Sequence, residues 1–142
     1  MARWNSVRVV GGPTNTTDAA TATTIASLDL AATTYSASPD DVAFQVKGIL
    51  IGRVTATTGA PAVGDCITVE VVRAYKRITG TVTALGGATT VSTGPIGDAS
   101  LTGIVGTLDN STTTVRLRAN GIVNTTISWT GHLEFFSGEF TG

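Results

Sequence analysis

Charged residues are scarce in this chain. They make up 13% of its 142 residues, whereas an average soluble domain has about 25%. The formal net charge is −1, and the nine basic residues are too scattered to neutralise a phosphate backbone. The sequence therefore predicts no nucleic-acid partner. A low charge suits a protein that lives in an assembly, although a small, mildly acidic domain has the same composition.

Residues that favour helices are also few. The chain has two Lys, three Glu and eight Leu, against 27 Thr and 17 Gly. Thr and Gly have low helix propensity, whereas Thr, Val and Ile pack well on a pleated sheet. Composition thus predicts an all-β fold and argues against helix bundles, coiled coils and Rossmann-type folds. The length fits one domain, or one domain with a tail.

Cysteine occurs once, so no intramolecular disulfide can form. Cys66 precedes Ile67 in an apolar run, which predicts a buried, unreactive thiol. No apolar run of signal-peptide or transmembrane length follows Met1, so we expect synthesis in a cytoplasm and no membrane partner.

Alternation of apolar and polar residues predicts seven or eight half-buried strands. The clearest span 41–54, 66–78, 81–85, 113–119 and 125–136, and weaker candidates span 4–10, 23–30, 88–98 and 101–108. Gly48 and Gly52 predict a bulge or bend, Asp109-Asn110 a turn, and Asn120-Gly121 a type I′ hairpin. This spacing of short strands is typical of a β-sandwich or jelly roll.

The N-terminal segment differs from the rest. Gly11-Gly12-Pro13 breaks the first candidate strand, and residues 14–37 are mostly Thr, Ala, Ser and Asp. Such a segment buries too little apolar area to become ordered alone. We therefore predict an extended N-terminal arm over residues 1–38, ordered on a partner, and a jelly-roll-like antiparallel β-sandwich over 39–142. A flexible terminus is the alternative.

Candidates for catalysis are sparse. The single histidine, His132, lies on the polar face of its strand, where a surface or interface role is expected. Asp40-Asp41 is explained by a turn that starts a strand, so no metal or cofactor site is predicted. A glycan hydrolase would need a carboxylate pair, such as Asp40 or Asp41 with Glu70 or Glu134. We predict that the chain is not an enzyme.

Two groups of basic residues stand out. Arg73, Lys76 and Arg77 form a small cluster, and Arg116 and Arg118 share one face of a strand. They either meet acidic groups of a neighbouring chain or lie on solvated strand faces.

The stretch from Val42 to Glu134 resembles a β-sandwich module of tailed-bacteriophage virion proteins, known chiefly as the C-terminal knob of tail fibres. The segments that carry the resemblance are Val42-Ala43-Phe44-Gln45-Val46, Gly52-Arg53, Gly59 and Gly64 before a strand, the residues from Arg73 to Arg77, Thr114-Val115-Arg116-Leu117-Arg118-Ala119-Asn120-Gly121 and Thr126-Ile127-Ser128-Trp129-Thr130-Gly131-His132-Leu133-Glu134. The last two segments are the most specific.

The resemblance implies a homotrimer on a virion, with no catalytic residues. Only residues 1–38 precede the sandwich, and they have neither heptads nor collagen-like repeats. This pattern looks more like a capsid decoration (cement) protein, which binds the major capsid protein on the outer capsid surface. A receptor-binding knob of a tail or head fibre is the alternative, with Tyr35, Tyr75 and Trp129 as candidates for glycan contact.

The decoration hypothesis assigns two sets of contact residues. The apolar residues of the arm would bind the partner, by strand addition to a sheet edge: Trp4, Val7, Val9, Ile25 and Leu28. The candidate intersubunit contacts are Arg116, Arg118, Phe136 and Phe140.

Overall fold

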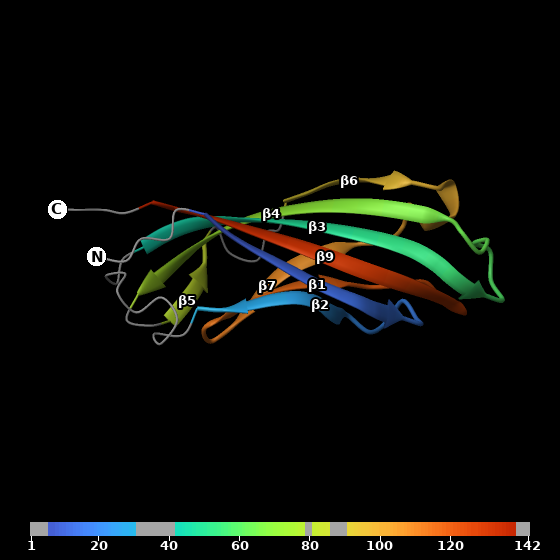
Figure 1. Cartoon of the computed structure of the whole chain (residues 1–142), viewed down its shortest axis with the longest axis horizontal. Helices are drawn as coiled ribbons and strands as arrows, with labels where there is room; N and C mark the ends of the chain where they lie inside the picture. The colour runs from blue at the N-terminus through green and yellow to red at the C-terminus, as the bar shows by residue number, and fades with distance from the viewer. Residues whose placement is uncertain (1–5, 31–41, 79–80, 86–90, 139–142) are drawn as a thin grey trace.

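The computed structural model describes residues 6–30, 42–78, 81–85 and 91–138, which form an antiparallel β-sandwich (Figure 1). Its strands are β1 (Ser6–Thr16), β2 (Thr23–Asp29), β3 (Val42–Thr57), β4 (Cys66–Ile78), β5 (Thr81–Ala84), β6 (Val91–Gly97), β7 (Gly106–Ser111), β8 (Thr114–Ala119) and β9 (Thr125–Gly138), with a short 3-10 helix, η1 (Ala99–Leu101). The prediction of an all-β sandwich is confirmed.

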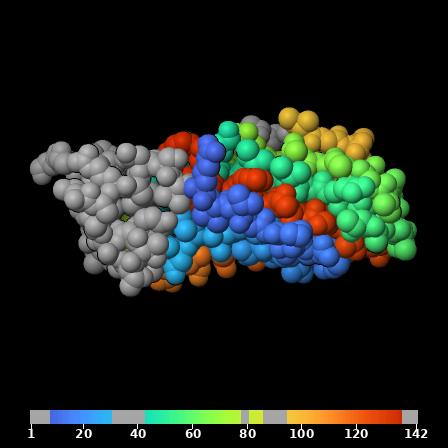
Figure 2. Space-filling view, viewed as in Figure 1, coloured from blue at the N-terminus to red at the C-terminus, as the bar shows by residue number. Residues whose placement is uncertain are grey.

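The strands divide unequally between two sheets. The larger sheet has six strands in the order β1-β9-β3-β4-β5, with β6 also paired to β4, and the smaller has the order β2-β8-β7. This division differs from the eight-stranded double sheet of a jelly roll. Figure 2 shows β1, β9, β3 and β4 as adjacent blue, red, teal and green bands on one side of the molecule.

The core lies between the sheets and follows the predicted period of two. In β9 the alternate residues Ile127, Trp129, Leu133 and Phe135 are buried. β4 contributes the matching set Ile67, Val69, Val71 and Tyr75. The Phe44 ring stacks on that of Tyr75 with centroids 5.5 Å apart, and it lies 6.2 Å from Phe135.

The two glycines of β3 make space for large side chains and do not form the predicted bulge. A Cβ atom on Gly52 would lie 2.6 Å from Cζ3 of Trp129, its register partner on β9. A Cβ on Gly48 would lie 2.7 Å from Cδ1 of Leu117 in the facing sheet. The irregularity in the β3–β9 pairing lies further along, after Val54.

The N-terminal segment corrects the prediction of an extended arm. β1 continues past Gly11-Gly12-Pro13 to Thr16 and pairs with β9, while β2 pairs with β8. Ile25 and Leu30 belong to the buried core. The described part of residues 1–38 therefore belongs to the sandwich, because few but well-placed apolar residues suffice when neighbouring strands provide the rest of the core.

The predicted hairpin at Asn120-Gly121 is also wrong, since β8 and β9 lie in different sheets. Gly121 instead lies against the end of β1: a Cβ there would be 2.5 Å from Oγ1 of Thr16. Its N–H donates to the Asp18 carbonyl oxygen at 2.9 Å, and the Asn120 side-chain amide donates to that of Ala19. The absence of a side chain at Gly121 lets the two backbone segments approach closely.

In the region before β8, the structure differs from two further predictions. Residues 101–108 are not one strand: Leu101 ends η1, and β7 begins only at Gly106. The Asp109-Asn110 pair lies inside β7, and the turn falls later, at Thr112, whose φ is 49°. Leu101 of η1 and Ile104 of the following loop are buried like Leu108 of β7, so the apolar pattern of one strand came from three different local structures.

The free thiol of Cys66 is exposed, which corrects the prediction of a buried cysteine. Cys66 is the first residue of β4, and alternation turns it outward because the next residue, Ile67, points into the core. The described part of the chain contains no helix with the length and hydropathy needed to span a membrane.

Candidate functional site

The outward side of the six-stranded sheet brings together residues that are far apart in sequence. Across β1, β9, β3 and β4, one row of register partners consists of Val10, His132, Ile49 and Glu70. The next row consists of Arg8, Glu134, Lys47 and Val72. Alternation forces this arrangement, because the intervening residues of each strand fill the core.

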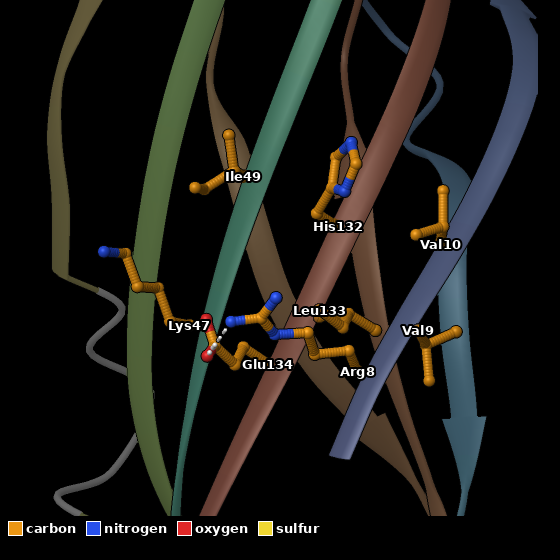
Figure 3. Close-up of a pocket in the computed structure, with 8 residues that line it drawn as sticks. All are labelled: Arg8, Val9, Val10, Lys47, Ile49, His132, Leu133 and Glu134. Atoms are coloured by element: carbon orange, nitrogen blue, oxygen red, sulfur yellow. Dashed lines mark hydrogen bonds and ion pairs between the residues drawn. The ribbon is translucent and has the colours of Figure 1, made fainter. Parts of the chain in front are cut away.

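These rows border a shallow cavity of about 320 Å³, which we call the outer groove (Figure 3). Its lining residues are Arg8, Val9, Val10, Lys47, Ile49, His132, Leu133 and Glu134. His132 is exposed, as predicted, and lies between two apolar neighbours, Val10 and Ile49. Val10 itself is 67% exposed.

Two ion pairs, each between a basic and an acidic side chain, border the groove. Nη2 of Arg8 lies 3.3 Å from Oε1 of Glu134, and Nζ of Lys47 lies 3.6 Å from Oε1 of Glu70. Exposed pairs of this kind contribute roughly 0–1 kcal/mol to stability because water and salt screen them. Their charges are therefore available to a binding partner at little cost to the fold.

Further apolar side chains extend this surface along the sheet. Ile51 is 43% exposed beside Thr130, and Phe136 is 42% exposed beside Gln45. Apolar residues among balanced charges are typical of a surface that binds a protein or another ligand of mixed character. They do not suit a polyanion, which needs a uniformly basic surface.

Two of the four carboxylates considered for hydrolysis are engaged in ion pairs. Glu70 pairs with Lys47 and Glu134 pairs with Arg8, while Asp40 and Asp41 lie outside the described residues. Within the described residues, no three His, Cys, Asp or Glu side chains lie close enough together to hold a metal ion.

The second basic group binds an acid of its own chain. On the outward side of the smaller sheet, Nε and Nη2 of Arg116 donate to the two Asp109 carboxylate oxygens at 2.7 and 3.0 Å. Arg118 donates to the same carboxylate at 3.2 Å and to the Ala22 carbonyl at 2.7 Å. The hydrogen bond and charge of Asp109 raise the pKa of Arg116. A contact of these arginines with a neighbouring chain stays a prediction.

The first basic group is divided between the two sides of β4. Lys76 is exposed, whereas Arg77 is buried. Nη1 of Arg73 donates to the Leu108 carbonyl at 2.9 Å, and its guanidinium lies 5.6 Å from the centre of the Tyr75 ring. Burial raises the pKa of Tyr75 to about 12, against the opposing charge of Arg73. Alternation along the strand was the signal that could have separated these residues.

The predicted arm contacts serve the sandwich itself wherever the structure describes them. Ile25 is a core residue, and Val9 and Leu28 pack against the core. Val7 is paired with Phe135 in the β1–β9 ladder, and Trp4 lies outside the described residues.

Of the aromatic candidates, only Phe136 is accessible in the described structure. Trp129 and Tyr75 are fully buried and offer no surface to a glycan. Tyr35 and Phe140 lie outside the described residues. Sequence analysis missed Arg8 and Val10, although their alternation with Val9 indicates an outward side.

Neither a protein-family model nor a curated protein sequence matches the chain. Among solved structures, the tailspike protein of Acinetobacter baumannii phage AM24 is similar to it with a TM-score of 0.55 and 15% identity, over 97% of this chain and 26% of that one. This chain thus spans about a quarter of the length of that tailspike. The tailspike of Acinetobacter phage vB_ApiP_P1 aligns over 98% of this chain and 22% of its own at 16% identity, but its TM-score of 0.35 is too low to indicate a shared fold. At these identities the likeness concerns the fold alone.

Proposed function

We propose that this chain is a structural module of a tailed-phage virion, located in the tail, that binds a receptor on the host surface. The observation that carries the proposal is the alignment of nearly the whole chain with one part of a phage tailspike. The motifs between Val42 and Glu134 that resemble virion β-sandwich modules support it independently.

The outer groove and the apolar residues beside it are the proposed contact surface. They combine accessible apolar area with paired charges of both signs, and they lie on paired strands of the sheet rather than on loops. A rigid surface of this kind loses little conformational entropy on binding. We expect the module to self-associate, and a trimer is the state that the sequence resemblance implies.

A location on the capsid is the competing hypothesis, and it relied on an N-terminal arm that reaches across capsomers. The described residues of that segment are paired in both sheets, and Ile25 is buried in the core. These residues would have to leave the sandwich to act as an arm, which favours the tail.

The location is tested by gold-labelled antibody on purified virions, viewed by electron microscopy. We expect label at the tail end. Label over the whole head would replace the tail hypothesis with a decoration protein, and the absence of label from virions would overturn both.

Receptor binding is tested with a matched pair of surface variants. Val10→Glu adds a charge beside the outer groove, and Ile96→Glu adds the same charge to a similarly exposed apolar residue of β6. We expect Val10→Glu to weaken binding of labelled protein to host cells by tenfold or more, and Ile96→Glu to leave it unchanged. Equal binding by both variants would exclude the groove as the receptor site.

A further inference from the structure

The chain contains a single histidine, His132, and the fold places it in the outer groove. Its neighbours in the sheet register are Val10 of β1 and Ile49 of β3. Figure 3 shows the imidazole ring between these two aliphatic side chains. His132 is exposed, and no hydrogen bond or ion pair joins it to another residue that the structure describes. The ring nitrogens therefore have no partner within this part of the chain.

The charged side chains around His132 come from all four strands of the groove, and they neutralise one another. Nη2 of Arg8 on β1 lies 3.3 Å from Oε1 of Glu134 on β9. Nζ of Lys47 on β3 lies 3.6 Å from Oε1 of Glu70 on β4. Each of these carboxylates already has a cation beside it, and the two cations oppose a further positive charge. Among the described residues that surround the groove, no acid is left to balance a protonated imidazole.

The charge of the imidazole becomes important when a ligand covers the groove. Histidine is the side chain whose charge ordinarily changes between about pH 5 and 8. Water solvates the protonated ring of an exposed histidine, but a ligand over Val10, His132 and Ile49 removes that water. Burial without a counter-charge favours the neutral form of a histidine. The neutral ring still donates a hydrogen bond from one nitrogen and accepts one at the other.

We infer that the outer groove binds the host receptor with His132 in its neutral form and releases the receptor on acidification. This inference rests on the proposed function, because it takes the outer groove as the receptor site. Protons compete with the receptor, so affinity is highest above the pH range in which histidine titrates and falls as the pH drops through it. The group of the receptor that lies against His132 is accordingly uncharged, since a carboxylate there would stabilise the protonated ring and reverse the effect.

The test measures binding of labelled protein to host cells at about pH 7.5 and about pH 5.5. We expect the parent to lose roughly tenfold in affinity, which is the loss for a ligand that binds only the neutral form of an ordinary histidine. His132→Gln keeps an uncharged hydrogen-bonding side chain, so its affinity should be the same at both pH values. His132→Lys keeps a positive charge and should bind weakly at both. His132→Asn is the second neutral variant if His132→Gln does not bind.

Circular dichroism at both pH values checks that the fold is unchanged. If the parent and the neutral variant lose binding equally on acidification, the sensitivity lies in the host receptor, and the inference is overturned while receptor binding stands. Binding by the parent that is equal at both pH values, or stronger at the lower one, overturns it in the same way. A parent that binds host cells at neither pH overturns the proposed function and this inference with it.

Discussion

Single residues in this sandwich are constrained by contacts across strands rather than by their own propensities. Gly52 lacks the positive φ that favours glycine, yet a Cβ atom there would lie within 3 Å of three atoms of the Trp129 ring. Trp129 is fully buried, and its Nε1–H donates to Oγ1 of Thr16 at 2.8 Å. The indole therefore cannot move aside without losing a buried hydrogen bond.

We predict that Gly52→Ala destabilises the fold by about 1–3 kcal/mol, the usual cost of overpacking a core. The measurement is the urea midpoint at unchanged m-value. Gly103→Ala is the control, because a Cβ there meets no atom within 4 Å, and it should stay within about 0.5 kcal/mol of the parent. Equal midpoints for the two variants would show that the ring yields to the methyl group.

Tyr75 should make the fold sensitive to alkali. Burial raises the pKa of its phenol from the ordinary value of 10 to about 12, so the folded state holds the proton more tightly than the unfolded state. The stabilisation, roughly 2–3 kcal/mol, is complete below pH 10 and is lost as the pH rises towards 12. In a Tyr35→Phe background, spectrophotometric titration should give a tyrosinate transition near pH 12 that returns to about 10 in denaturant. A native transition near 10 would contradict the burial.

At the scale of strands, periodicity predicted which residues face the core. The predicted bounds of 66–78 are those of β4, and its alternate residues Ile67, Val69 and Val71 are buried as expected. Periodicity does not predict which strands pair with one another. Asn120-Gly121 suggested a hairpin, but the chain crosses there from the smaller sheet to the larger one. Gly121 instead lies against Thr16 at the end of β1, a contact between distant parts of the chain that the local sequence does not indicate.

The candidate site was predictable only in part for the same reason. Alternation placed His132 and Glu134 on one side of their strand. Their meeting with Arg8 and Lys47 depends on the register of β1 and β3 with β9, which is set by contacts between distant parts of the chain. The alternation within one strand therefore predicts which of its residues face outward, but not which residues of neighbouring strands lie beside them.

β2 offers a direct test of whether the N-terminal segment is part of the fold. Ile25 is 5% exposed and lies in the core, so Ile25→Ala should cost about 2–5 kcal/mol of unfolding free energy. Val10→Ala, at a residue 67% exposed, should change it by less than about 0.5 kcal/mol. Chemical denaturation of both variants measures the difference. A small effect at Ile25 would restore the hypothesis of a separable arm.

At the scale of the whole molecule, the first and last strands of the described chain pair with each other at one edge of the larger sheet. β9 lies between β1 and β3, so the last strand of the sequence bridges the first strand and the middle of the chain. Residues such as Val9 and Leu133 are register partners despite their distance in sequence. Loop-closure entropy delays such contacts, so the larger sheet is completed only when β9 is in place.

We therefore predict that the chain unfolds as one cooperative unit. In a Trp4→Phe variant, the fluorescence of Trp129 reports the core, and far-ultraviolet circular dichroism reports all strands. The two urea transitions should coincide, and refolding should take milliseconds to seconds, as in other folds dominated by distant contacts. Ile25→Ala provides the control, because it should move both transitions together. A circular-dichroism transition that precedes loss of the Trp129 signal would mean that β1 and β2 detach from a sandwich that survives without them.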